Sequence, residues 1–271
     1  MIANARMYAV TPGVAAHWRA LFAWVGARAD IALETIEHAA PNPLHTLWTR
    51  GDLGCAFMCG YPWATWTPPP PRPALVAAPV PSPPRYAHRS AYCTDIVVRA
   101  DSDIMHVDAL RGRRFAFTTP SSQSGYQAPR ELFAAVARDN GGAWFERAIG
   151  PLVTPRAVVD AVIAGTVDAG PLDSYWHDLL ARHERATAAR LRTIASTPLT
   201  PMPPLVCAAA VAPEKRTRIA DALLAAEAAA ELRDLRDELL IERFVVPSPA
   251  EYAILVANAQ RADALGYRRL Q

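Results

Sequence analysis

The segment Thr118–Arg130, TTPSSQSGYQAPR, joins a strand pattern to a helix pattern through a turn rich in hydroxyl groups. Before it, Arg114–Thr118 alternates polar and apolar residues, and after it Leu132, Phe133 and Val136 recur at helical spacing. The first amides of a helix lack intrahelical partners, and the helix dipole adds partial positive charge there. A serine-lined helix start can therefore bind a phosphate-like anion without a lysine.

An ordinary helix cap is the alternative interpretation of this turn, with Ser124 satisfying its own helix. Pro129 bears on the choice because it has no amide hydrogen and disfavours a helical Ala128. We expect regular helix to begin late or to kink there, which would leave the amides from Gln123 to Tyr126 for a ligand. Other parts of the chain must decide between the two interpretations.

The composition is that of a globular protein. The chain has 271 residues, of which 51% are hydrophobic and 20% charged, enough for one large core or two lobes. Its net charge of +2 comes from 28 basic and 26 acidic residues without a basic stripe, so we expect no nucleic-acid partner. No apolar stretch reaches the roughly 18 residues of a membrane span.

The N-terminus and the cysteines bear on the compartment. Met1–Val10 has no basic start, apolar middle or small-residue cleavage site, and it reads as a strand. The protein is cytoplasmic if Met1 is the native start, or periplasmic if a leader was removed. The four cysteines lie in predicted strands, where thiols behave as small buried hydrophobes. Cys55 and Cys59 have no nearby histidine, so we expect no zinc site, and we expect no cofactor.

The first part of the chain alternates strands with helices, which favours parallel sheets. A helix follows Thr11-Pro12-Gly13, and a proline-rich surface excursion spans Gly60–Pro84. The other elements expected before the second lobe are strands at Ile2–Val10, Ala32–Glu37, Leu53–Cys59, Ala74–Val80 and Tyr92–Arg99, and a short helix at Pro43–Thr49.

The rest of the chain repeats the pattern and ends in helices. The expected strands are Arg114–Thr118, Ala148–Val153, Val167–Leu172, Arg190–Ala195 and Leu205–Val211. The expected helices follow Ser124 or span Pro155–Ala164, Asp173–His183, Glu214–Ala230, Glu231–Arg243 and Pro249–Ala264.

The predicted fold is a two-lobed α/β protein, each lobe a mostly parallel sheet flanked by helices. Lobe 1 comprises residues 1–92 and 198–271, lobe 2 comprises residues 93–197 with the anion-binding loop, and two crossings join them. In such folds ligands bind at the carboxyl ends of the strands, here in the cleft between the lobes.

Residues just after the predicted strands form the candidate site. Thr154-Pro155 is a cap followed by a proline and would aim a second helix start at the same anion. Asp173 also fits a simple cap. Trp66 fits packing, and Trp63 fits either packing or the site. The candidate ligand-binding residues are Tyr8, Tyr61, Ser121, Ser122, Gln123, Ser124, Gly125, Tyr126, Thr154 and Asp173.

Five segments in order resemble the phosphate, phosphite and phosphonate-type solute-binding proteins of ABC transporters. RGRRFAFTTPSSQSGYQAPRELF is similar to the signature turn of that family, and LGCAFMCGYPW to a strand ending in Gly-x-Tyr. The others are VVDAVIAGTVDAGPLDSYWHDLL, STPLTPMPPL and ERFVVPSPAEYAIL. The resemblance covers nearly the whole chain and implies a type II periplasmic-binding fold.

The resemblance also implies roles for individual residues. Ser122, Gln123 and Ser124 match the anion-gripping Ser-Thr-Ser of the family, and Tyr61 matches a tyrosine that closes the site from the other lobe. Tyr8 and Asp173 match positions after strands.

Several positions depart from the family pattern. Pro155 replaces a histidine, while Tyr175 and Pro203 replace the glutamate and aspartate of an aminoalkylphosphonate binder. A buried ammonium without a carboxylate is strongly penalised, so an amine-bearing ligand fits poorly unless Asp173 substitutes. Gln123 in place of threonine adds a group that both donates and accepts, which suggests a differently shaped head group.

These observations favour the substrate-binding component of an ABC uptake system, a monomer that binds a small anionic phosphate-, phosphonate- or sulfonate-like solute and partners a permease. One alternative is an enzyme on the same scaffold, which needs a nucleophile and base. His177 is the residue best placed for that role. The other alternative is a cytoplasmic sensor with a partner surface at Pro68–Pro84.

Overall fold

The computed structural model describes residues 1–67 and 69–271, so Pro68, the first residue of the expected partner surface, lies outside the described residues. The chain forms two compact units. Unit 1 comprises Met1–Ala91 and Pro201–Tyr252, and unit 2 comprises Tyr92–Thr200 and Ala253–Gln271. The chain therefore passes between the units after Ala91, Thr200 and Tyr252, three times instead of the expected two. Residues Ala253–Gln271, which we call the C-terminal segment, were expected in lobe 1 and belong to unit 2.

Unit 1 is built on a six-stranded sheet in the order β13-β4-β12-β3-β1-β2. β1 pairs in parallel with β2 and β3, whereas β12 runs antiparallel to β3 and β4, and β13 runs antiparallel to β4. The strands are β1 (Ile2–Asn4), β2 (Glu34–Thr35), β3 (Leu53–Phe57), β4 (Ala74–Pro81), β12 (Leu205–Cys207) and β13 (Ile241–Val245).

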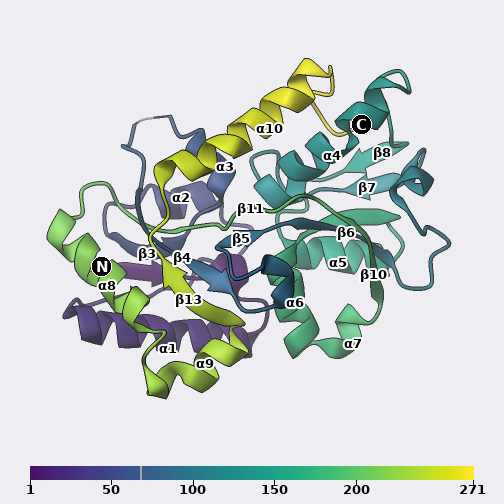
Figure 1. Cartoon of the computed structure of the whole chain (residues 1–271). Coiled ribbons are helices and arrows are strands. Elements are labelled where there is room, and N and C mark those ends of the chain that lie inside the picture. The colour runs from purple at the N-terminus through teal and green to yellow at the C-terminus, as the bar shows by residue number, and fades with distance from the viewer. Residues whose placement is uncertain (68) are drawn as a thin grey trace. The chain divides into compact units, whose positions relative to one another are not determined.

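Helices cover this sheet, and α1 packs against α8 and α9 (Figure 1). The α-helices are α1 (Pro12–Ala29), α2 (Leu44–Trp48), α3 (Gly60–Ala64), α8 (Pro213–Ala225) and α9 (Arg233–Glu238). Single 3-10 turns are η1 (Arg6–Tyr8), η2 (Pro84–Tyr86), η5 (Ala230–Leu232) and η6 (Pro249–Tyr252). The apolar face predicted for α1 is buried, at Val14, Trp18, Leu21, Phe22 and Val25.

Two expected elements of unit 1 differ from the structure. The first strand ends at Asn4 instead of Val10, because the Asn4 side chain accepts a hydrogen bond from the Arg6 amide and turns the chain. The helix expected over Glu231–Arg243 stops at Glu238, and Leu240 adopts a left-handed φ of 54°. The chain then forms strand β13, whose Ile241 and Phe244 are buried against the sheet.

Unit 2 is built on a five-stranded sheet in the order β10-β6-β9-β7-β8. β7 runs parallel to β8 and β9, whereas β6 runs antiparallel to β9 and β10. Both sheets are mixed, but four of the six strands in the sheet of unit 1 and four of the five in the sheet of unit 2 run in the same direction, so the predicted α/β class with sheets flanked by helices is confirmed. The strands are β6 (Thr94–Arg99), β7 (Arg114–Ala116), β8 (Arg147–Ile149), β9 (Ala169–Asp173) and β10 (Leu191–Ser196). A separate pair comprises β5 (Ala91–Tyr92) and β11 (Thr200–Pro201).

The helices of unit 2 come after its strands, as the sequence predicts, except the last, which comes after strand β13 and the 3-10 turn η6 of unit 1. They are the 3-10 turn η3 (Val107–Leu110), the π-helix η4 (Gln123–Gln127), α4 (Ala128–Arg138), α5 (Pro155–Ile163), α6 (Ser174–His183), α7 (Arg185–Ala188) and α10 (Ala253–Ala264). α5 packs against β9, and α10 packs against α4 (Figure 1).

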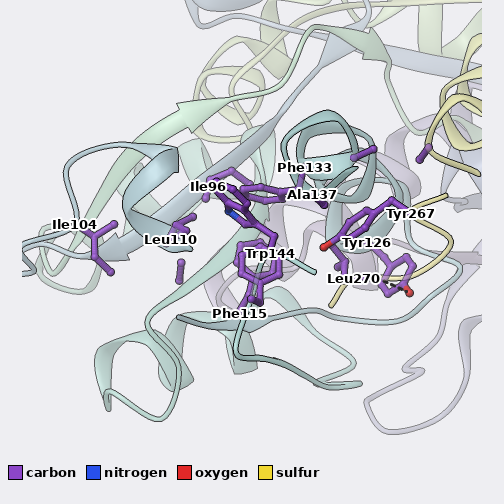
Figure 2. Close-up of a cluster of buried hydrophobic side chains, with 14 of the residues drawn as sticks. Ile96, Ile104, Leu110, Phe115, Tyr126, Phe133, Ala137, Trp144, Tyr267 and Leu270 are labelled. Carbon is purple, nitrogen blue, oxygen red and sulfur yellow. Dashed lines mark hydrogen bonds between the residues drawn. The ribbon is translucent and has the colours of Figure 1, made fainter. Parts of the chain in front are cut away.

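The core of unit 2 explains why the C-terminal segment belongs to it. Phe115 stacks on Phe145 with ring centroids 4.5 Å apart, and Phe133 meets both rings edge-on. Tyr267 and Leu270 are buried in the same cluster, as Figure 2 shows. Burying these apolar side chains stabilises the C-terminal segment on unit 2.

An ion pair fastens the start of β7 to the turn before β9. Asp168 accepts hydrogen bonds from the Arg114 amide at 2.8 Å and from Arg114 Nε and Nη2 at 3.1 and 2.9 Å. The side-chain hydrogen bond from Arg114 is the largest cause that lowers the pKa of Asp168. A lowered carboxyl pKa stabilises the fold above the unfolded pKa, and the contribution is lost as pH falls through the folded pKa.

We expect Asp168→Asn to lower the midpoint of urea unfolding at pH 7, and the difference from wild type to shrink as pH falls below the unfolded pKa and through the lowered pKa of the folded carboxyl. Circular dichroism during urea unfolding, recorded at pH 7 and at successively lower pH, measures the difference in midpoint. Asp101→Asn is the matched control, because Asp101 pairs with Arg99 at 74% side-chain exposure and should change little. An equal pH dependence in wild type and Asp168→Asn would contradict this account.

Candidate anion-binding edge

The parallel strands of unit 2 bring three predicted groups of site residues to one edge of the sheet. β7 lies between β9 and β8 and runs parallel to both, so the carboxyl ends of the three strands lie together. Ser121–Tyr126 follows β7, Thr154 follows β8, and Asp173 ends β9. We call this the carboxyl edge of unit 2.

A helix with a capped first turn begins after each of these strands. The Ser122 hydroxyl accepts a hydrogen bond from the Gly125 amide at 3.0 Å, and Thr154 accepts one from the Ala157 amide at 3.1 Å. Asp173 Oδ1 accepts from the amides of Tyr175 and Trp176, both at 3.0 Å. The helix after β7 is thus capped by Ser122 and not by Ser124, the residue named in the alternative interpretation. Each helix start contributes partial positive charge to the carboxyl edge.

The helix after β7 opens with a π-turn and continues directly into α4. The Gln127 amide donates to the Ser122 carbonyl at 3.0 Å, and Ala128 is helical with φ −65° and ψ −48°. Regular α-helix therefore begins late, at Ala128, which is one of the two outcomes predicted from Pro129, and the preceding π-turn leads into it without a break. Proline lacks an amide for the carbonyl four residues earlier, that of Gly125, and this carbonyl accepts from the Thr118 amide at 3.2 Å instead.

The predicted anion-binding turn, residues 118–125, is tied to neighbouring segments through its main chain. The Thr118 carbonyl accepts from the Val153 amide at 3.0 Å, and the Ser124 carbonyl accepts from the Thr94 hydroxyl at 3.3 Å. The Thr118 hydroxyl is buried beside Gly125, and within the described residues it has no hydrogen-bond partner. Sequence reasoning did not select Thr94 or Thr118 as site residues, because nothing in a strand pattern shows which hydroxyl faces the turn.

Backbone strain lies next to Thr154. Val153 is β-branched, yet it adopts a left-handed φ of 69°. The Thr154 amide donates to the Leu152 carbonyl at 2.8 Å, which makes this a γ-turn centred on Val153. Such strained residues cluster at functional sites, where the surrounding structure holds them. Here the turn places the Thr154 cap.

The remaining predicted residues of unit 2 differ in exposure. Ser121 is exposed, Ser122 and Ser124 are half-buried, and Gln123 is buried. The Tyr126 side chain lies in the hydrophobic core, and its hydroxyl accepts a hydrogen bond from the Leu270 amide at 3.3 Å (Figure 2). The side chain of Tyr126 therefore belongs to the hydrophobic core. Only the main chain of Tyr126 fits the predicted role of ligand binding.

The two tyrosines predicted in the first lobe lie in unit 1. Tyr8 is buried and packs edge-on against Phe57 with ring centroids 4.8 Å apart. Tyr61 is half-buried on the short helix α3. Trp63 is buried, and its indole donates to the Pro73 carbonyl at 2.9 Å, while the Trp66 indole donates to the Pro70 carbonyl at 2.8 Å. Both tryptophans thus pack against the proline-rich segment.

A buried acid organises the other side of β9. Asp95 is fully buried, its Oδ2 lies 2.9 Å from His177 Nδ1, and its Oδ1 accepts from the Ser196 hydroxyl at 2.7 Å. His177, the residue best placed for the alternative of an enzyme, therefore bridges α6 to β6.

Burial raises the pKa of Tyr175 well above its ordinary value, so this phenol is neutral.

The cysteines are buried thiols outside disulfides. Burial raises the pKa of Cys207 to about 11 and that of Cys55 further, which makes these thiols unreactive at neutral pH. In the part of the chain that the structure describes, no three His, Cys, Asp or Glu side chains gather as metal ligands would. None of the described helices combines the length and the apolar character that a bilayer span requires.

Comparison with known families gives a match over residues 14–252 to the model described as "ABC transporter, phosphonate, periplasmic substrate-binding protein". The chain belongs to this family. Its members are substrate-binding components of ABC transporters and not enzymes, so the resemblance of the five segments is confirmed and the alternative of an enzyme is set aside. Comparison with curated proteins gave no match.

Solved structures of similar fold agree with this assignment. PhnD1 from Prochlorococcus marinus in complex with methylphosphonate has a TM-score of 0.77 at 15% identity, covering 97% of this chain and 98% of that one. A binding component of an ABC phosphonate transporter from Pseudomonas aeruginosa has a TM-score of 0.73 at 16% identity, covering 99% and 97%. A Xanthomonas citri protein bound to ATP scores 0.63 at 17% identity, covering 97% and 98%. At these identities the likeness shows the periplasmic-binding fold.

Proposed function

We propose that this substrate-binding protein carries a small phosphonate- or phosphate-like anion without an ammonium group, and delivers it to the permease of an ABC uptake system. Ser121, Ser122, Gln123 and Ser124 would grip the oxyanion, with main-chain amides between Gln123 and Tyr126 other than that of Gly125, which donates to the Ser122 hydroxyl. The helix start at Thr154 would lie beside them.

The observation that carries this proposal is the pair of helix starts at the carboxyl edge of unit 2 that are capped by the neutral hydroxyls of Ser122 and Thr154. Amides at helix starts and their dipoles favour a compact negative charge. The buried Thr118 hydroxyl adds a polar group beside the same turn. The methylphosphonate complex of the Prochlorococcus protein supports a phosphonate as the class of ligand.

The side chains at the carboxyl edge argue against an ammonium group in the ligand. Asp173 Oδ1 accepts hydrogen bonds from two amides and so serves its own helix. Tyr175 is neutral and buried where an aminoalkylphosphonate binder has a carboxylate. An ammonium group placed here would lose its hydration without gaining a dedicated carboxylate.

Isothermal titration with matched ligands tests this proposal. We expect methylphosphonate, phosphate or both to bind, and propylphosphonate to bind at least about tenfold more tightly than 2-aminoethylphosphonate, since one unpaired buried charge costs more than 1.4 kcal/mol. The two organic ligands have the same number of heavy atoms and differ in a methyl against an ammonium group. Tighter binding of 2-aminoethylphosphonate would contradict the proposal, and so would the absence of binding by every phosphonate and by phosphate.

A further inference from the structure

Arg130 is a buried guanidinium with every donor engaged. Its side chain is 4% exposed, and it lies in the third position of α4. Nε and Nη2 donate to Gln127 Oε1 at 3.0 and 2.8 Å, and Nη1 donates to Asp263 at 2.5 Å and to the Tyr267 carbonyl at 3.0 Å. Nη2 also donates to the Ala259 carbonyl at 2.9 Å. These contacts use all five N–H groups of the arginine.

The same network continues into the anion-binding turn. Gln127 accepts from Arg130 through Oε1, and its Nε2 donates to the Pro120 carbonyl at 2.7 Å. Pro120 precedes the serines of the turn. One glutamine side chain thus joins the turn to the guanidinium, and the guanidinium joins both to the C-terminal segment.

A second contact between the turn and the C-terminal segment is independent of Arg130. The Tyr126 hydroxyl, on the π-helix that starts at the turn, accepts from the Leu270 amide. Figure 2 shows Tyr126 beside Tyr267 and Leu270. The C-terminal segment therefore reaches the π-helix both through a polar network and through the core.

We propose that the C-terminal segment Ala253–Gln271 positions the anion-binding turn, with Arg130 and Gln127 as the positioning residues. Binding an oxyanion through main-chain amides requires those amides to be held in one arrangement before the ligand arrives, because ordering them on binding would cost affinity. A fully paired guanidinium is suited to this role, since its planar fork fixes the direction of each partner. The effect on affinity rests on the proposed function, whereas the effect on the ordering of the turn does not.

Gln127→Glu is the most discriminating variant. Glutamate keeps the acceptor for Arg130 but replaces the donor to the Pro120 carbonyl with an oxygen, so the connection to the turn is cut while the connection to α10 is kept. We expect a urea-unfolding midpoint near that of wild type, faster hydrogen exchange of the amides of residues 118–127, and about tenfold weaker binding of methylphosphonate. Arg130→Lys, which cannot supply five donors in a fork, should change exchange and affinity in the same direction.

Arg261→Ala is the matched control. Arg261 pairs with Glu131 and so also joins α10 to α4, but it contacts neither Gln127 nor the turn. Its exchange over residues 118–127 and its affinity should equal those of wild type. Hydrogen exchange at the wild-type rate in both Gln127→Glu and Arg130→Lys would overturn the proposal. It would also be overturned if Arg261→Ala exchanged as fast and bound as weakly as those two variants. If wild type binds neither methylphosphonate nor phosphate while exchange still rises in Gln127→Glu, the proposed function fails and the positioning role stands.

Discussion

Replacing Gly125 with alanine should abolish oxyanion binding and destabilise unit 2. A Cβ atom at this position would lie 1.9 Å from the Thr118 hydroxyl and 2.9 Å from Thr118 Cβ. Threonine is stiff at χ1 and cannot move aside without shifting the backbone. Such overpacking typically costs about 1–3 kcal/mol, and here it also displaces the turn that presents the amides. Urea unfolding and titration with methylphosphonate and phosphate measure the two effects.

Gly13→Ala is the matched control for this substitution. Gly13 lies in the first turn of α1, where a Cβ atom would have only the Thr11 hydroxyl at 3.7 Å, an ordinary contact. Alanine there should be neutral or slightly stabilising, because it favours the helix. Equal stability and affinity of Gly125→Ala and Gly13→Ala would show that the close approach of Thr118 to Gly125 is not required.

Removing the Asp95 carboxylate should strongly destabilise unit 2. Asp95 is fully buried and holds His177 of α6 and Ser196 of β10 to strand β6. Leaving a buried hydrogen-bonding partner unsatisfied typically costs about 1–3 kcal/mol, and Asp95 serves two such partners. His177 is partly exposed, so we expect about 2–4 kcal/mol for Asp95→Ala. Urea unfolding at pH 7 checks this value.

Asp103→Ala serves as the comparison for Asp95→Ala. Asp103 is 81% exposed and lies 3.5 Å from Arg113, so its loss should be too small to measure. A destabilisation of Asp95→Ala as small as that of Asp103→Ala would mean that the Asp95, His177 and Ser196 contacts do not hold α6 and β10 to the sheet.

Local signals in the sequence predicted the elements that surround the candidate site. Thr11 before Pro12, Thr154 before Pro155 and Asp173 before α6 were each recognised as helix starts, and each is a cap in the structure. A cap and the proline after it act within one turn, so the sequence alone specifies them.

Features that depend on tertiary contacts could not be predicted in this way. β13 reads as a continuation of a helix, and it is a strand because it pairs with β4. The helix pattern of Ala253–Ala264 does not show which unit the helix belongs to. It belongs to unit 2 partly through hydrogen bonds from the buried Arg130, which looks in the sequence like an ordinary surface arginine. The sequence does not show that the Gly125 carbonyl, which Pro129 leaves without a helical partner, accepts from the Thr118 amide outside the helix.

The candidate site follows the same division. The serines of the turn and Thr154 could be selected from their positions after strands, whereas the strain at Val153 and the buried Thr118 hydroxyl become visible only in three dimensions. Asp173 could be placed at the carboxyl edge and interpreted as a cap from its position before α6, and in the structure it caps two amides.

The central claim is that the turn after β7 binds the oxyanion, and titration of Ser122→Ala/Ser124→Ala with methylphosphonate and phosphate tests it most directly. Thr166→Ala is the control, because its hydroxyl serves an exposed turn away from the carboxyl edge. We predict that the double variant folds, with a loss of about 1 kcal/mol for the Ser122 cap, and binds at least about a hundredfold more weakly than wild type. Affinity equal to that of wild type in the folded double variant would contradict the account.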